Sequence, residues 1–147
     1  MKLLVAIDAT PSTEAIISEL LLRPWPVDTL VRLLYVKKPL SISSDFVDVE
    51  SYVEYEDEAA TRLIEQMANS LAGKGLNVST AIIKGRPQKT IVKDAAQWGA
   101  DLIIVGAQQN NKLKSSFLDR VAKDVIRTAP CSVQIVRERM NGVAELE

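Results

Sequence analysis

The amino-acid sequence predicts a doubly wound α/β fold, in which a single five-stranded parallel sheet is covered by about four helices. Two observations carry this prediction. Short apolar runs with the length of buried strands recur along the chain, and stretches with apolar residues at helical spacing separate them. Because parallel strands must be joined by right-handed crossovers, usually through a helix, the alternation favours a parallel sheet with helices on both faces.

The first strand is expected over residues 3–7, which are continuously apolar and end at Asp8. A helix follows, because Thr10 and the residues after it supply hydroxyls that can cap free amides and a proline that the first helical turn tolerates. Apolar residues at helical spacing continue until prolines at positions 24 and 26 end the segment. Residues 30–36, rich in branched and aromatic side chains, predict the second strand.

An acidic segment covers residues 39–58, where no lysine or arginine balances the carboxylates. Its acidic residues are Asp45, Asp48, Glu50, Glu54, Glu56, Asp57 and Glu58. A long helix is expected from Ala59 to Leu71, and acids before it suit the positive end of its dipole. We therefore predict a solvated loop and helix entrance here, with an acidic partner-binding segment as the alternative.

The second half of the chain repeats the pattern. Gly73 and Gly75 are expected to end the long helix, Gly85 to permit a turn with positive φ before Pro87, and Gly99 to cap a helix. The remaining elements are expected as strands at 76–83, 102–105 and 132–136 and as helices at 88–98 and 118–129. One domain over residues 1–139 and a flexible tail at 140–147 complete the organisation.

The composition excludes several classes of protein. The formal net charge is −1, so no basic field attracts nucleic acid or an anionic membrane, and no apolar stretch approaches the ~20 residues of a membrane span. Histidine is absent, which removes the usual general base and a common metal ligand. The single cysteine, Cys131, precludes an intrachain disulfide and fits a reducing cytoplasm, and it is expected to be a buried structural thiol.

A ligand crevice in such a sheet forms beyond the carboxyl ends of the strands, where successive connections turn in opposite directions. The candidate positions are residues 8–10, residues 36–38, Gly85 and the loop after Gly106. The Asp8 carboxylate could bind a ligand amine or hydroxyl, or it could accept the free amides of the first helix. Lys37 and Lys38 could meet a phosphate or serve solubility.

Three segments carry a resemblance to a known family: LLVAIDATPS, GRPQKTIVKDAAQWGADLIIVG and VAKDVIRTAPCSVQIV. Over nearly its full length the chain resembles the universal stress protein family. The resemblance implies a Rossmann-like fold of the adenine nucleotide alpha hydrolase type, with strand order 3-2-1-4-5, and a cytoplasmic role in stress endurance. It also implies a homodimer formed through the fifth strand, at Ser132, Val133, Gln134, Ile135 and Val136.

Members of this family that bind ATP carry a loop of the form Gly-x2-Gly-x9-Gly-Ser or Gly-Thr, and other members lack it. Placed on this chain, the four motif positions are Gly106, Gln109, Asp119 and Arg120, so three of them depart from the pattern. The Gln109 side chain hinders close backbone approach to a phosphate. A carboxylate such as Asp119 at ~4 Å from a phosphate oxygen costs about 4 kcal/mol at an effective dielectric of 20. The chain thus resembles the branch that does not bind ATP.

A rearranged nucleotide crevice is the alternative. Ser116 and Asp119 fit a helix-capping pattern that would leave fewer amides for a ligand, whereas Arg120, Lys112 and Lys114 add positive charge to the same loop. The vestigial or alternative crevice would comprise Asp8, Ala9, Thr10, Val36, Gly106, Gln109, Ser115, Ser116 and Arg120.

The expected function is that of a non-catalytic, ATP-independent stress-response protein that acts as a homodimer with unidentified protein partners. No cofactor and no metal are expected, because the sequence contains neither a Walker-type loop nor metal-ligand spacing. The alternative is a stress switch that binds ATP or AMP through the loop after Gly106 and orders the acidic segment as a lid. An enzyme is the third possibility, and it would require nucleotide binding first.

Overall fold

The structure, a computed structural model, describes residues 1–39, 49–107 and 117–138, except for the side chains of 49–54 and 117–119. Strands and helices alternate throughout. The strands are β1 (Lys2–Ile7), β2 (Leu30–Lys37), β3 (Asn77–Lys84), β4 (Leu102–Ala107) and β5 (Ser132–Arg137). The helices are α1 (Pro11–Leu22), α2 (Val49–Ala72), α3 (Pro87–Trp98) and α4 (Phe117–Thr128). The expected tail at 140–147 lies outside the described residues.

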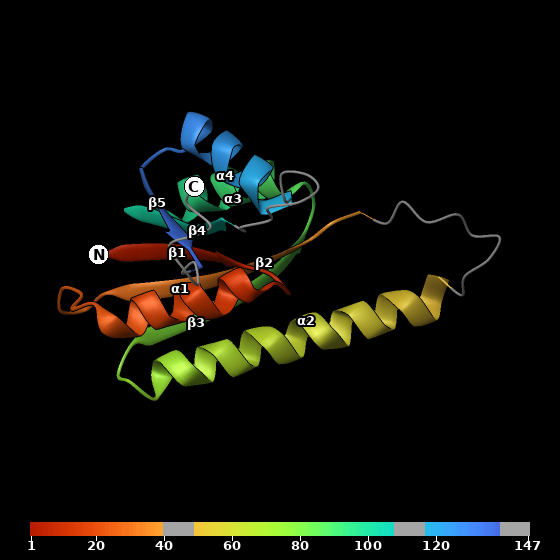
Figure 1. Cartoon of the computed structure of the whole chain (residues 1–147), viewed down its shortest axis with the longest axis horizontal. Coiled ribbons are helices and arrows are strands. Elements are labelled where there is room, and N and C mark those ends of the chain that lie inside the picture. The colour runs from red at the N-terminus through yellow and green to blue at the C-terminus, as the bar shows by residue number, and fades with distance from the viewer. Residues whose placement is uncertain (40–48, 108–116, 139–147) are drawn as a thin grey trace, which may run out of the picture.

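The strands form one parallel sheet in the order β3-β2-β1-β4-β5, which confirms the predicted fold class and order. Figure 1 shows the two outer layers, with α1 and α2 on one face of the sheet and α3 and α4 on the other. The three central strands are β2, β1 and β4, and every residue of β1 after Lys2 is buried. Burial on both faces explains why this strand is continuously apolar.

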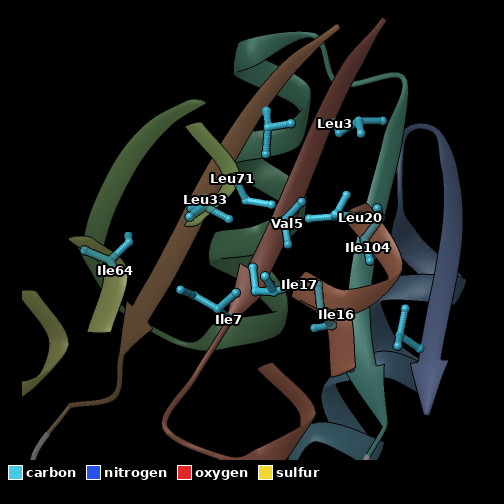
Figure 2. Close-up of a cluster of buried hydrophobic side chains, with 12 residues drawn as sticks. Leu3, Val5, Ile7, Ile16, Ile17, Leu20, Leu33, Ile64, Leu71 and Ile104 are labelled. Atoms are coloured by element: carbon cyan, nitrogen blue, oxygen red, sulfur yellow. The ribbon is translucent and has the colours of Figure 1, made fainter. Parts of the chain in front are cut away.

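Each face of the sheet has its own apolar core. Figure 2 shows the first cluster, in which Val5, Leu33 and Ile104 of the sheet lie among side chains of α1 and α2 such as Leu20 and Leu71. The second cluster lies on the other face, between the sheet and helices α3 and α4. Fully burying one such side chain contributes about 1.5–3 kcal/mol. The two clusters therefore hold the strand ends, and the crevice beyond them, in fixed positions.

The acidic segment is where the sequence prediction of a loop is wrong. Helix α2 begins at Val49, so half of the segment that we expected to be loop is helical. An acidic side chain in the first turn stabilises a helix through its dipole, and Glu50 has this position in α2. Figure 1 shows that this amino-terminal part of α2 extends beyond the carboxyl ends of the strands. Asp57, in this part, forms an ion pair with Lys37 at the end of β2.

Two glycine predictions had different outcomes. Gly99 adopts φ 78° and ψ 43° and donates its N–H to the Ala95 carbonyl, which confirms it as the cap of α3. Gly85 does not have the positive φ that we predicted. Glycine is favoured at position 85 for a steric reason, because a Cβ there would lie 2.6 Å from Thr90 Oγ1.

Candidate functional site

The candidate site lies at the carboxyl ends of β1 and β4. From β1 the chain passes through α1 to β2 on one side of the sheet, whereas β4 and β5 lie on the other side. This reversal places the topological switch point between Asp8, which follows β1, and Gly106, near the end of β4. We call the region around Asp8, Thr10, Ser12, Lys38 and Gly106 the crevice, after the position that topology assigns to a ligand.

The Asp8 carboxylate is occupied by groups of its own turn. Its Oδ1 accepts hydrogen bonds from the Thr10 backbone N–H at 3.1 Å and from the Thr10 hydroxyl at 2.5 Å. Thr10 is the N-cap residue of α1, so the carboxylate meets an amide at the helix start, which was one of the two predicted roles. The Thr10 hydroxyl, in contrast, makes no capping hydrogen bond to the helix amides, although the sequence suggested one.

A second hydroxyl closes the same turn. Thr13 Oγ1 donates to the Asp8 carbonyl at 2.6 Å and accepts from the Asp8 N–H at 2.9 Å. Thr13 is 2% exposed, so these bonds satisfy backbone groups that have little access to water. The sequence analysis treated Thr13 as a helix-start residue and missed this role. The bonds join residues five positions apart, and the sequence did not predict the conformation of the turn between them.

Asp8 also faces a cation across the crevice. Burial raises the pKa of the Asp8 carboxyl above its ordinary value, and the hydrogen bonds from Thr10 and the charge of Lys38 partly oppose this effect. Burial also lowers the pKa of Lys38, and the nearby Asp8 charge opposes that shift. The structure thus brings together two predicted positions from neighbouring strands, and their opposite charges compensate each other.

The other predicted positions on this side have different surroundings. Val36 is half-buried and packs against the second core cluster, and Ala9 is exposed at the tip of the turn. Lys37 pairs with Asp57 of α2, and its carbonyl accepts the Gly85 N–H at 2.9 Å. Arg120 lies in the first turn of α4 with its side chain exposed.

Gly106 is needed for packing. A Cβ at this position would lie 2.6 Å from Ser12 Cβ and 3.3 Å from Ile16 Cδ1. The first turn of α1 therefore packs directly on the backbone of β4, and only glycine permits this approach. Ser12 is fully buried, and its Oγ has no hydrogen-bond partner among the described residues. An unpaired buried hydroxyl at the crevice is a feature that the sequence could not reveal.

The rest of the predicted loop lies outside the described residues, including Gln109, Ser115 and Ser116. Helix α4 begins at Phe117, and the predicted capping by Ser116 falls outside the described residues. Among the described residues, no group of three His, Cys, Asp or Glu side chains is placed to hold a metal ion. Burial and the nearby Asp101 raise the pKa of the Cys131 thiol, which reduces its reactivity. No helix in the described ranges is long and apolar enough to cross a membrane.

Comparison with known sequences gives a family match. The profile of the Universal stress protein family matches residues 1–137. Universal stress protein MJ0577 of Methanocaldococcus jannaschii is 31% identical over 97 residues, which are 61% of this chain and 60% of that protein. Universal stress protein YxiE of Bacillus subtilis is 32% identical over 76 residues, 52% of this chain and 51% of that protein. The matches thus span about half to three fifths of these curated relatives.

Solved structures share the fold over more of the chain. The structure of MJ0577 superposes with a TM-score of 0.78 at 25% identity, covering 95% of this chain and 97% of that one. A universal stress protein family protein of Arabidopsis thaliana, solved with AMP bound, has a TM-score of 0.70 at 18% identity and covers 95% of this chain and 92% of its own. A universal stress protein in complex with cAMP has a TM-score of 0.63 at 17% identity, and the match covers 92% of this chain and 95% of that one.

Proposed function

The chain belongs to the universal stress protein family, and we propose that it acts within this family as a non-catalytic, ATP-independent stress-response protein of the cytoplasm that works as a homodimer. In this proposal the crevice is a degenerate nucleotide site. Its role is structural, because its polar groups hold the turn between β1 and α1 in place.

The observation that carries this proposal is the occupancy of Asp8. Its Oδ1 already accepts two hydrogen bonds from Thr10, so a ligand would compete with the chain's own groups for this oxygen. The sequence adds to this argument, because Gln109 and Asp119 stand at two glycine positions of the ATP-binding loop. A carboxylate beside a phosphate group weakens phosphate binding through charge repulsion.

The homodimer is supported by the place of β5 in the sheet. β5 pairs with β4 on one side only, so its other edge presents backbone N–H and C=O groups without a strand partner among the described residues. Pairing of such an edge with a second copy would satisfy these groups and remove a site of aggregation. An interface through β5 with two-fold symmetry would place each β5 residue close to the same strand of the partner.

Thermal unfolding with millimolar ATP and magnesium tests the degenerate crevice. A ligand at 100 times its dissociation constant stabilises a protein by about 2.7 kcal/mol, so binding would raise the melting temperature by several degrees. We expect no shift for the natural chain and a shift for a variant with Gln109→Gly, Asp119→Gly and Arg120→Ser, which restores the ATP loop. A saturable shift in the natural chain would refute ATP independence.

Light scattering at several protein concentrations tests the dimer. We expect a dimer for the natural chain and a shift toward monomer for Gln134→Lys, because the symmetric interface would bring two like charges close together. Gln97→Lys is the matched control, since Gln97 is an exposed glutamine on α3. A monomeric natural chain at micromolar concentration, or equal behaviour of the two variants, would contradict the proposed interface.

A second function, binding of AMP or ATP by a rearranged crevice, is favoured by one observation. Ser12 Oγ is buried at the crevice without a partner among the described residues, and such a hydroxyl could donate to a phosphate. Relatives of this fold have been solved with AMP and with cAMP. Calorimetric titration with AMP would decide, and this function predicts that Ser12→Ala weakens binding whereas Ser18→Ala, on the exposed surface of α1, leaves it unchanged.

A further inference from the structure

A pocket lies at the opposite end of the sheet from the crevice. It is bounded by the segment after α1, the turn after α2 and the first residues of β2 and β3, and we call it the amino-end pocket. In Figure 1 this is the end of the molecule that carries the amino terminus. The pocket has a volume of about 540 Å³, which lies in the range of small-molecule sites. Its lining includes Leu20, Arg23, Trp25, Leu30, Lys74 and Leu76.

Apolar side chains form one part of the lining of the amino-end pocket, and they are held in place. Leu20 is 1% exposed, and Trp25 and Leu76 are partly buried side chains that pack against the first core cluster. Trp25 Nε1 donates a hydrogen bond to the Leu20 carbonyl at 2.9 Å, which fixes the indole ring. A ring that is already ordered loses little conformational freedom when a ligand packs on it.

Apolar side chains also surround the opening. Leu21 and Val27 line the pocket and are 37% and 88% exposed. Large apolar side chains gathered around a hollow are typical of a binding surface, because isolated ones occur everywhere on proteins whereas clustered ones are uncommon. An apolar part of a ligand would therefore gain burial both inside the pocket and at its rim.

The charges of the lining select the polar part of the ligand. Arg23 and Lys74 are cationic and Asp28 is anionic, so the lining has one net positive charge. Arg23 is held by an ion pair from its Nε to Glu19 at 2.7 Å, and Glu19, outside the lining, is partly screened by water. The carboxyl ends of α1 and α2 add partial negative charge nearby, which disfavours a ligand with two or more negative charges. A ligand with a single negative charge therefore fits the one net positive charge of the lining.

We propose that the amino-end pocket binds a small amphipathic monocarboxylate. Its aliphatic or aromatic part packs on Trp25 and the neighbouring leucines, and its carboxylate meets Arg23 and Lys74. The proposal is independent of the crevice and of nucleotide binding, because the pocket and the crevice lie at opposite ends of the strands.

Titration with octanoate, followed by tryptophan fluorescence, tests the proposal. The chain has two tryptophans, and Trp98→Phe leaves Trp25 as the reporter. Trp98 lies in α3 on the other face of the sheet, where Lys2 Nζ is 5.5 Å from its ring centre. We expect a saturable change with octanoate and a weaker response to 1-octanol, which has the same chain but no charge. No saturable change at millimolar octanoate would overturn the proposal.

Charge variants separate this site from general hydrophobic binding. Arg23→Gln and Lys74→Gln should each weaken octanoate roughly tenfold, the effect of one charge-assisted hydrogen bond, and leave octanol unchanged. Lys93→Gln, at an exposed lysine of α3, should leave both ligands unchanged. Both tested residues are exposed, and thermal unfolding verifies that each variant is folded. If octanoate binds all the variants equally, or if Lys93→Gln weakens it as much, the assigned site is wrong.

Discussion

The crevice and the amino-end pocket are opposite ends of the same sheet, yet their polar groups are arranged in opposite ways. In the crevice, Asp8 is bonded by Thr10 and faces Lys38. In the amino-end pocket, Trp25 packs on the core while Arg23 and Lys74 stay exposed at the opening. At the end where topology predicts a ligand, the carboxylate is thus hydrogen-bonded within its own turn, whereas the opposite end has an open lining of mixed apolar and charged side chains.

The largest expected effect concerns the packing of the crevice. Gly106→Ala should lower the free energy of unfolding by about 2–3 kcal/mol, because the new Cβ would meet Ser12 Cβ at 2.6 Å and the base of a side chain cannot rotate away. Gly85→Ala is the control, since its Cβ would meet the rotatable Thr90 hydroxyl at the same distance and should cost about 1 kcal/mol or less. Urea unfolding compares the two. Equal stability of Gly106→Ala and the natural chain would show that α1 does not pack on β4 as described.

The next effect separates the two hydroxyls at the start of α1. Thr13→Val should cost about 1–2 kcal/mol, because it removes both bonds to the Asp8 backbone and leaves its N–H unpaired. Ser12→Ala should stay within about 0.5 kcal/mol of the natural chain, because the Ser12 hydroxyl has no partner in the described part of the structure. Thermal unfolding of both variants measures the difference. A cost for Ser12→Ala equal to that of Thr13→Val would indicate that Ser12 is paired.

At the amino-end pocket a smaller effect of opposite sign is expected. Asp28 has φ 64°, so Asp28→Gly should stabilise the protein by about 0.5–1 kcal/mol through relief of backbone strain. Gly75, which also lines this pocket and has φ 86°, supplies the reverse test, because Gly75→Ala should destabilise by a similar amount. Denaturant midpoints give both values. Destabilisation by Asp28→Gly would mean that the Asp28 side chain makes a stabilising contact.

The smallest effect is the pH dependence of Asp8. The pKa of Asp8 in the folded state is raised above its ordinary value of 3.8, so the protonated carboxyl is favoured in the folded protein. The stability that protonated Asp8 contributes is therefore fully present below pH 3.8 and is lost as the pH rises through the folded-state pKa. Asp8→Asn stays neutral and keeps an acceptor for the Thr10 N–H. The melting temperature of the variant relative to the natural chain should therefore rise between pH 4 and pH 7. A relative fall over this interval would indicate that the bonds from Thr10 and the charge of Lys38 outweigh burial.

Most of the fold could be predicted because its signals are local. Apolar runs and stretches rich in branched side chains identified all five strands to within one or two residues, and Gly99 marked the end of α3, where it adopts a left-handed conformation. The start of α2 was wrong by ten residues, since charged residues in a first helical turn and in a loop look alike in sequence. Asp8 and Lys38 follow neighbouring strands as predicted, because parallel strands bring their carboxyl ends to one edge of the sheet.

The sequence alone determined the order and type of the elements and the family, because these depend on neighbouring residues and on fixed spacings. Only the tertiary structure decided which groups meet. It paired Asp8 with Thr10, placed Ser12 against Gly106, and brought Trp25 and Leu76 into the lining of one pocket at the other end of the sheet. Contacts of this kind depend on how helices pack on strands that are distant in sequence, and no local pattern encodes that packing.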